Sequence, residues 1–237
     1  SLRHARDEQQ QRFQRDKLTA LGEMSAALAH EIRNPVGVIN TAAALLDKAE
    51  HDAPRRAELI RMLREESTRI SNLVQDFLQL SRYRAPEFLE IDPVEPMQRA
   101  LNAALAGRAD IRVEQRFAHR DARILADASL LQQAWSNILT NAVQAVGERG
   151  GELTFVTQVA DGELLLSIED SGPGIPADIL PRLFEPFFTT KPQGTGLGLT
   201  IANTLVEASG GRLEIMAPEK GGARIGMRFP VYEKITA

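Results

Sequence analysis

Apolar or small residues recur at alternating steps of three and four in the first part of the chain, which is the spacing of a heptad seam. The pattern predicts one long helix from Leu2 to about Glu50. The seam consists of Leu18, Leu21, Ser25, Leu28, Ile32, Pro35, Ile39, Ala42 and Leu46, with Leu18 at a and Leu21 at d. In this frame His30 takes position f, which points away from any partner helix. The pattern therefore predicts an exposed imidazole, which by itself is most often an ordinary surface histidine.

A second heptad seam follows a predicted turn at Ala49–Pro54 and runs from Leu59 to Leu80. Two such helices joined by a short turn predict an antiparallel hairpin, which alone buries too little apolar surface to be stable. Because both seams are narrow, we expect two copies to form a dimeric four-helix bundle; the alternative is a hairpin that packs on the rest of its own chain. Residues 1–17 are polar on all sides, which predicts either a signalling linker helix or an ordinary solvated helix.

Beyond a predicted linker at Ser81–Pro86, short strands alternate with helices. Helices are predicted at Pro93–Ala106, Ala128–Val146 and Leu197–Ser209, and strands at Phe88–Ile91, Ile111–Phe117, Ala122–Leu125, Glu152–Val159, Leu164–Glu169, Arg212–Ala217 and Ala223–Val231. Asp161-Gly162 is a hairpin signal between two of the strands. Helices combined with antiparallel strands predict an α+β sandwich. The expected domains are therefore a linker helix at 1–17, a helical domain at 18–85 and a sandwich at 86–237.

The composition excludes several kinds of function. The chain contains no cysteine, so disulfides, zinc–thiolate sites and thiol nucleophiles are excluded. Its net charge of −4 gives no sign of a nucleic-acid partner. No apolar run reaches the roughly 18 residues that a membrane span needs. Since the chain starts at Ser1 within a polar helical pattern, we expect a cytoplasmic piece of a longer protein, with a sensor or membrane segment upstream.

Two glycine-bearing segments of the predicted sandwich are typical of nucleotide contacts. Asp170–Gly174 follows an apolar strand, and Gly194–Gly198 opens a helix. Glycines at a helix start let a phosphate approach the free backbone N–H groups. The carboxylate of Asp170 can accept a hydrogen bond from an exocyclic amine such as that of adenine. Taken singly, each segment could also be a set of tight turns, and the second lacks the context of a Rossmann fingerprint and the ending of a P-loop.

Two further segments of the predicted sandwich carry residues that can contact a nucleotide. Asn137 and Asn141 are four residues apart, so they share one face of their helix, and amide oxygens can ligate Mg²⁺ beside nucleotide phosphates. Buried structural asparagines would give the same spacing. The run from Leu183 to Lys191 places three phenylalanines in a loop flanked by glycine and proline. It fits either plain core or a mobile lid with a lysine able to reach phosphate.

Together these motifs resemble those of the sensor histidine kinases of two-component systems. The H-box, N-box, first G-box, F-box and second G-box occur in the family's order, at Leu21–Pro35, Asn137–Asn141, Asp170–Gly174, Phe184–Phe188 and Gly194–Gly198. The resemblance implies a dimerisation and phosphotransfer hairpin followed by a Bergerat-type ATP-binding domain, the type found in gyrase and Hsp90. Within this family, the sequences His30–Pro35 and Asn141–Ala145 look more like those of the nitrogen-regulation subgroup.

The resemblance also implies roles for single residues. His30 would accept the γ-phosphoryl group of ATP and pass it to an aspartate on the receiver domain of a response regulator, with Glu31 as general base or orienting carboxylate. Asn34 would orient water for dephosphorylation of that regulator. Asn137 and Asn141 would hold Mg²⁺, and Asp170 would recognise adenine. The nucleotide and its lid would be lined by Gly172, Gly174, Lys191, Gly194, Thr195, Gly196, Leu197 and Gly198.

The chain departs from the family pattern at one point. Gln144 and Ala145 stand where many members have a basic residue and a tyrosine, so Lys191, Arg182 or Arg149 would have to supply the positive charge near phosphate. The alternative to an active kinase is a kinase-dead dimeric scaffold or phosphatase that binds nucleotide without phosphorylating His30. An ATP-driven machine of the gyrase or chaperone type is less favoured, because the N-box helix carries no catalytic carboxylate at the Asn137 position.

Overall fold

The computed structural model describes residues 2–48, 52–81, 85–118, 121–147, 150–191 and 194–232. The chain divides into two compact units. The first comprises Ser1–Ala85 and Glu185–Leu197, and the second comprises Pro86–Phe184 and Gly198–Ala237. The domain boundaries expected from the sequence stay predictions.

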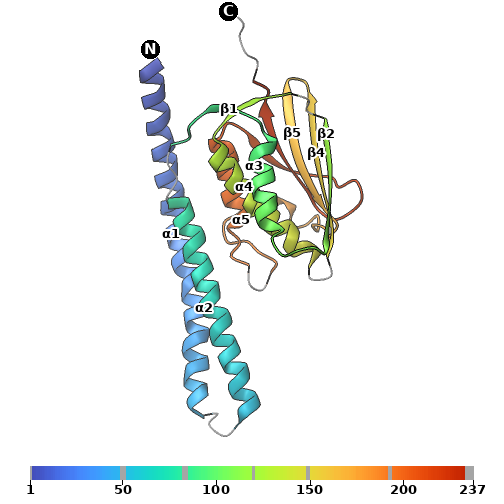
Figure 1. Ribbon diagram of the computed structural model, residues 1–237. Coiled ribbons are helices and arrows are strands. Elements are labelled where there is room, and N and C mark those ends of the chain that lie inside the picture. The colour runs from blue at the N-terminus through green and yellow to red at the C-terminus, as the bar shows by residue number, and fades with distance from the viewer. Residues whose placement is uncertain are drawn as a thin grey trace, which may run out of the picture. The chain divides into compact units, whose positions relative to one another are not determined.

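The first unit is built on two long helices, α1 (Leu2–Lys48) and α2 (Ala53–Ser81), which pack side by side as an antiparallel hairpin (Figure 1). At the start of α2, the side chain of Asp52 accepts a hydrogen bond from the backbone N–H of Arg55 at 3.0 Å. Residues 49–51 of the predicted turn and residues 82–84 of the predicted linker lie outside the described residues. The predicted hairpin is confirmed, and its assembly into a dimer stays a prediction.

The buried residues of the hairpin follow the predicted seams with one exception. Ala42, Leu59 and Leu73 are buried, as the heptad pattern predicts. The prediction for Ser25 is wrong, because Ser25 is exposed and Met24 is buried in its place. A helix of 3.6 residues per turn drifts against a strict 3.5-residue repeat, and the larger apolar side chain takes the buried position. The side chains of Leu18, Leu21 and Leu80 lie outside the described residues.

The second unit contains a five-stranded sheet in the order β2-β4-β5-β7-β6. Its strands are β2 (Ile111–Ala118), β4 (Gly151–Ala160), β5 (Glu163–Asp170), β6 (Arg212–Met216) and β7 (Arg224–Pro230). The expectation of antiparallel strands is wrong for one pair, because β2 runs parallel to β4. Parallel neighbours need a crossover connection, and here the chain between them passes through a helix. A small second sheet pairs β1 (Leu89–Ile91) with β3 (Ile124–Ala126).

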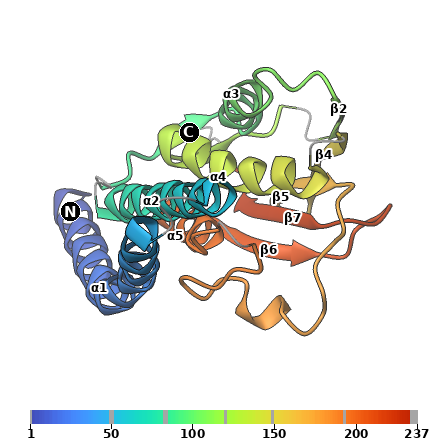
Figure 2. The same cartoon turned by 90° about the horizontal axis from the view of Figure 1, so that it is seen from below.

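Helices α3 (Val94–Ala104), α4 (Ala128–Val146) and α5 (Gly198–Ala208) cover one face of the five-stranded sheet (Figures 1 and 2). Strands β5, β7 and β6 lie side by side beneath them (Figure 2). Trp135 of α4 and Phe155 of β4 are buried at the interface, with ring centroids 6.2 Å apart. The predicted α+β sandwich is confirmed. Between β5 and α5 the glycine- and proline-rich stretch contains a 3₁₀ turn, Leu180–Arg182.

Asp127 fixes the start of α4, the helix that carries the predicted asparagine pair. Its carboxylate accepts hydrogen bonds from the backbone N–H groups of Ser129 and Leu130 at 2.9 and 3.2 Å, and from that of Glu87 at 2.9 Å. Burial alone would raise the pKa of Asp127, but these hydrogen bonds and one from the Ser129 hydroxyl outweigh it, so the pKa is lowered. The N-cap therefore ties the first segment of this unit to α4.

Replacing Asp127 with Ala is expected to lower the free energy of unfolding of the second unit by about 1–2 kcal/mol at pH 7. Urea denaturation followed by Trp135 fluorescence reports this unit, because Trp135 is the chain's sole tryptophan. A carboxyl with a lowered folded-state pKa stabilises the fold above its unfolded-state pKa of 3.8, and this contribution disappears as the pH falls through the folded-state value. The stability difference between wild type and Asp127→Ala should therefore shrink below pH 3.8. A pH-independent difference would contradict the ionised N-cap, and Asp127→Asn should lose less stability because it keeps an acceptor.

Candidate functional site

The predicted phospho-acceptor segment lies on α1. His30 and Asn34 are one helical turn apart and both are exposed. The exposure of His30 is what the heptad frame predicts for its position f. Glu31 is half-buried, and its Oε2 atom lies 3.7 Å from the guanidinium of Arg69 on α2. The hairpin thus presents an accessible imidazole beside a carboxylate that is held toward the second helix.

Arg69 was missed by sequence reasoning. Its Nε atom and the Oε2 atom of Glu66 are buried and, among the described residues, meet no hydrogen-bond partner. A polar residue at a seam position, as Glu66 is, could have drawn attention to this part of α2. Arg69, which reaches Glu31, is therefore part of the environment of the phospho-acceptor segment.

The asparagine pair lies on α4, whose observed bounds match the predicted ones. Asn137 is half-buried, and within the described part of the chain its Nδ2 atom is buried without a hydrogen-bond partner. A Cβ built at Gly198, the first residue of α5, would lie 3.5 Å from Nδ2 of Asn141. The structure thus brings Asn141 to the start of α5, where backbone N–H groups lack helical partners.

Asp170 ends β5 and is buried. Its Oδ1 atom accepts hydrogen bonds from the backbone N–H of Gly172 at 2.8 Å and, more weakly, from that of Ala223 at 3.4 Å. A Cβ at Gly172 would lie 2.8 Å from this oxygen and 2.9 Å from Cβ of Ala145. Glycine is therefore required at position 172, because the backbone there passes close to both the end of β5 and the last turn of α4. Ala145, the departure from the family pattern, contacts this segment directly.

The loop between β6 and β7 was missed as part of this site. Gly222 has φ +83°, and a Cβ there would overlap the carbonyl oxygen of Asp170. Gly174, with φ +81°, leaves a Cβ only 2.9 Å from the carbonyl oxygen of Gly222. The pair Gly221-Gly222 was the available signal in the sequence. The loop Ala217–Ala223 therefore lies directly against the first glycine segment.

The second glycine segment lies mostly in the first unit. Phe187 donates a backbone hydrogen bond to the carbonyl of Gly196 at 3.1 Å, and a Cβ at Gly196 would overlap the Phe187 backbone. Leu197 is fully buried. The backbone N–H of Gly194 donates a hydrogen bond to the carbonyl of the predicted lysine, Lys191, at 3.1 Å. These contacts hold the second glycine segment against Phe187 and Lys191.

Thr195 has a partner on the helical hairpin. Its hydroxyl donates a hydrogen bond to Oδ2 of Asp76 on α2 at 2.6 Å. Burial raises the pKa of Asp76, although this hydrogen bond opposes the shift. Asp76 was not among the residues singled out from the sequence, because one carboxylate on a helix gives no distinguishing pattern.

The predicted site residues therefore fall into two sets. One set lies in the second unit, around α4, the end of β5 and the start of α5, and contains Asn137, Asn141, Asp170, Gly172, Gly174 and Gly198. The other lies in the first unit and contains His30, Glu31, Asn34, Lys191, Gly194, Thr195, Gly196 and Leu197. Arg182 and Arg149 were the other two residues expected to supply positive charge near phosphate. Arg182 is exposed, and Arg149 lies outside the described residues.

Two family comparisons match the two parts of this architecture. Residues 20–86 match the His Kinase A (phospho-acceptor) domain. Residues 126–233 match the histidine kinase-, DNA gyrase B-, and HSP90-like ATPase family. The chain belongs to the sensor histidine kinases. Both the helical hairpin and the sandwich of this histidine kinase core are therefore those of its family.

Relatives of this histidine kinase core include the sensor protein kinase PilS of Pseudomonas aeruginosa, which is 36% identical over 95% of the chain and 44% of the relative. The sensory histidine kinase/phosphatase NtrB of Rhizobium meliloti is 32% identical over 81% of the chain and 54% of the relative. Among solved structures, the histidine kinase ThkA in complex with response regulator protein TrrA has a TM-score of 0.71 and 28% identity, over 95% of the chain and 66% of ThkA. The chain spans about half the length of these curated relatives.

The residues of this ATPase-type domain fit a bound nucleotide. The partnerless Nδ2 atom of Asn137 is a buried donor that a phosphate or carbonyl oxygen could satisfy. The start of α5 beside Asn141 offers backbone N–H groups of the kind that bind phosphate.

Among the described residues, no cluster of three His, Asp or Glu side chains gathers to hold a metal ion. None of the described helices has an apolar stretch of the length and hydropathy that a bilayer span requires.

Proposed function

We propose that the chain is the core of an ATP-dependent protein-histidine kinase that phosphorylates His30 and passes the phosphoryl group to an aspartate of a response regulator. The observation that carries the proposal is the exposed His30 on a phospho-acceptor hairpin, followed in the same chain by an ATPase-type domain. An exposed imidazole can meet first the nucleotide and then a partner protein.

The chemistry that we propose is nucleophilic attack by a ring nitrogen of His30 on the γ-phosphorus of ATP. An N–P bond forms, the bond from phosphorus to the ADP oxygen breaks, and ADP leaves. The attacking nitrogen must be unprotonated, and Glu31 would orient the ring or accept its proton. The guanidinium of Arg69 lies 3.7 Å from Oε2 of Glu31 and holds the carboxylate toward α2. A carboxylate held in this way supports an orienting role for Glu31.

In the proposed nucleotide site, Asp170 accepts a hydrogen bond from the 6-amino group of adenine. Asn141 and Asn137 would hold Mg²⁺ with the phosphate oxygens, and the metal would neutralise charge that develops during transfer. Gly172, Gly174 and Gly198 would line the nucleotide. Lys191 and the segment from Gly194 to Leu197 would cover the phosphates as a lid.

The same hairpin supports a second activity toward the regulator. Asn34 is exposed one helical turn from His30, where its amide could orient water against an aspartyl phosphate. NtrB is named a kinase/phosphatase, which supports this role by analogy. ThkA was solved with a response regulator, which supports a receiver domain as the partner. A scaffold or phosphatase that binds nucleotide without phosphorylating His30 is the alternative outcome.

We also propose that the hairpin dimerises. Four apolar side chains of the hairpin are between 38 and 40% exposed in the single chain, and a second copy would cover them: Val36, Ile60, Val74 and Leu78.

Because the chain spans about half the length of its relatives, we expect a sensor segment elsewhere in the whole protein. The resemblance to the nitrogen-regulation subgroup suggests an enhancer-binding activator as the regulator.

Incubation with γ-labelled ATP and Mg²⁺ is expected to label the chain with an acid-labile, base-stable phosphoryl group. Peptide mapping should place the label on the peptide that contains His30. Chelation of Mg²⁺ with EDTA is expected to reduce labelling more than about a hundredfold, because the phosphate charge is no longer neutralised. Nucleotide binding without any label would favour the scaffold alternative, and an acid-stable label would refute the proposal.

A further inference from the structure

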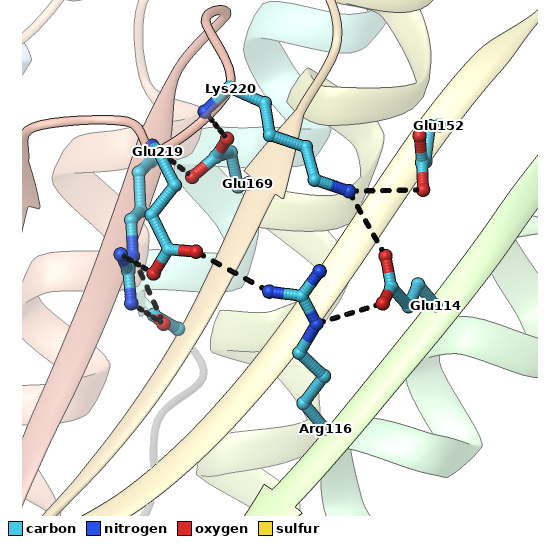
Figure 3. A network of polar contacts seen from close by, with 8 residues as sticks. Glu114, Arg116, Glu152, Glu169, Glu219 and Lys220 are labelled. Atoms are coloured by element: carbon cyan, nitrogen blue, oxygen red, sulfur yellow. Dashed lines mark hydrogen bonds and ion pairs between the residues drawn. The ribbon is translucent and has the colours of Figure 1, made fainter.

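The face of the sheet opposite the helices carries a network of charged side chains. Glu114 and Arg116 of β2, Glu152 of β4, Glu169 of β5, and Glu219 and Lys220 of the β6–β7 loop converge on it (Figure 3). Residues alternate between the two faces of a strand, so Glu169 points to this face while its neighbour Asp170 belongs to the proposed nucleotide site.

Glu169 differs from the rest of the network in what it binds. Its Oε2 atom accepts a hydrogen bond from the backbone N–H of Glu219 at 2.7 Å, and its Oε1 atom accepts one from that of Lys220 at 2.8 Å. Glu169 is 8% exposed, so the carboxylate that accepts these bonds is largely buried. A buried carboxylate that binds two successive backbone N–H groups fixes the path of the main chain at that point.

Most of the surrounding side-chain pairs contribute little to fixing the loop. Lys220 reaches Glu114 at 3.2 Å with half of its side chain exposed, and exposed pairs of this kind are weak. Hydrogen bonds from Arg116 and Lys220 lower the pKa of Glu114 to about 2, which reflects their ion pairs at the surface. Arg224 is the exception, because it is buried and donates to Glu219 at 2.7 Å. It therefore holds the same loop from the adjacent strand β7.

The anchored loop in turn contacts Asp170. Two residues after Lys220, Gly222 packs so closely on the Asp170 carbonyl that no Cβ would fit. The next residue, Ala223, accepts a hydrogen bond from the Asp170 backbone N–H at 2.9 Å, and its own N–H points to Oδ1 of Asp170 at 3.4 Å. The main chain from 219 to 223 thus links the Glu169 carboxylate to both the backbone and the side chain of Asp170.

We propose that Glu169 is a positioning residue of the nucleotide site, which holds the loop 217–223 against Asp170 and so aims the Asp170 carboxylate at the 6-amino group of adenine. The inference rests on the proposed role of Asp170. Glu169 and Asp170 act together although their side chains lie on opposite faces of β5. The loop carries the constraint from one face to the other around the end of the strand.

The test compares the binding of ADP and IDP to the full chain by titration calorimetry. The two nucleotides differ at position 6 of the base, where IDP carries an oxygen in place of the amino group. Wild type is expected to prefer ADP, because a carboxylate accepts from the amine and repels the oxygen. Glu169→Gln keeps the shape but presents an amide donor to one of the two loop N–H groups. We expect it to reduce the ADP:IDP affinity ratio about tenfold.

The matched control is Glu214→Gln, on the same face of the sheet. Glu214 accepts a hydrogen bond from the side chain of Arg228 at 2.7 Å and is not among the residues that anchor the loop. This variant should keep the wild-type ratio. An unchanged ratio in Glu169→Gln, or an equal loss of affinity for both nucleotides, would overturn the positioning role, because a merely structural role weakens both alike. If Trp135 fluorescence shows Glu169→Gln to be unfolded, Glu169→Asp, whose carboxylate is one methylene shorter, supplies the same test.

Asp170→Asn separates the failure of this inference from the failure of the proposed function. If Asp170 recognises adenine, this variant should lose the preference for ADP by about tenfold or more. A preference that persists in Asp170→Asn refutes the proposed role of Asp170, and with it the inference. A preference that is lost in Asp170→Asn and retained in Glu169→Gln refutes the positioning role alone.

Discussion

Replacing His30 with Gln is expected to abolish phosphoryl labelling from ATP, with a loss of more than about a thousandfold, while ADP binding stays at the wild-type level. A glutamine amide is a poor nucleophile, because its nitrogen lone pair is delocalised into the carbonyl group. The side chain is exposed on α1, so its replacement leaves the packing of the hairpin unchanged. Labelling with γ-labelled ATP and titration calorimetry with ADP measure the two effects separately.

His51→Gln is the matched control for this prediction. The chain has four histidines, and His51 belongs to the predicted turn between the two helices rather than to the H-box. This variant should be labelled as wild type is. Equal labelling of His30→Gln and wild type would assign the phospho-acceptor to another residue, and loss of ADP binding in His30→Gln would point to a global defect.

Replacing Gly222 with Ala is expected to destabilise the second unit by about 2–5 kcal/mol and to weaken ADP binding at least about tenfold in the protein that remains folded. Two costs combine at this position. An L-residue at φ +83° is strained by about 1–2 kcal/mol. The added Cβ would also overlap the backbone of Asp170, which forces the loop away from it. Urea denaturation followed by Trp135 fluorescence gives the first effect, and calorimetry with ADP gives the second.

Gly162→Ala separates the two costs. Gly162 has φ +75°, in the turn between β4 and β5, and a Cβ there would have no atom within 4 Å. This control should therefore show the backbone strain of about 1–2 kcal/mol and no change in ADP affinity. If both variants lose the same stability and both bind ADP normally, the close packing of the loop on Asp170 is not needed for the site.

Local patterns in the sequence were sufficient to predict most helices and strands. The bounds of α4 agree with the prediction at both ends, because Asp127 supplies an N-cap and Gly147 follows the last apolar turn. The turn at Asp161-Gly162 was equally clear, since both residues take positive φ. The parallel pairing of β2 with β4 could not be predicted, because an alternating pattern identifies a strand and not its neighbour.

The exposed His30 and the glycine segments could be identified from the sequence because each is a short-range pattern of residue types. The partners that hold them could not. Arg69 lies 38 positions from Glu31 in the chain and Thr195 lies 119 from Asp76, and no local spacing connects such pairs. Glu169 was predicted only as the last residue of a strand, and no local pattern shows that it anchors a loop 50 residues away.

The sequence by itself determined the two kinds of domain, the heptad phase that leaves His30 at the surface, and the residue types needed to bind a nucleotide. These features depend on helical and strand periodicity and on side-chain chemistry, which are local properties. Only the tertiary structure decided that the β6–β7 loop lies against Asp170, that Glu169 binds its backbone, and that Asn141 meets the start of α5. Such contacts arise from the order of strands in the sheet and the close packing of its helices, which bring together residues that are far apart in the chain.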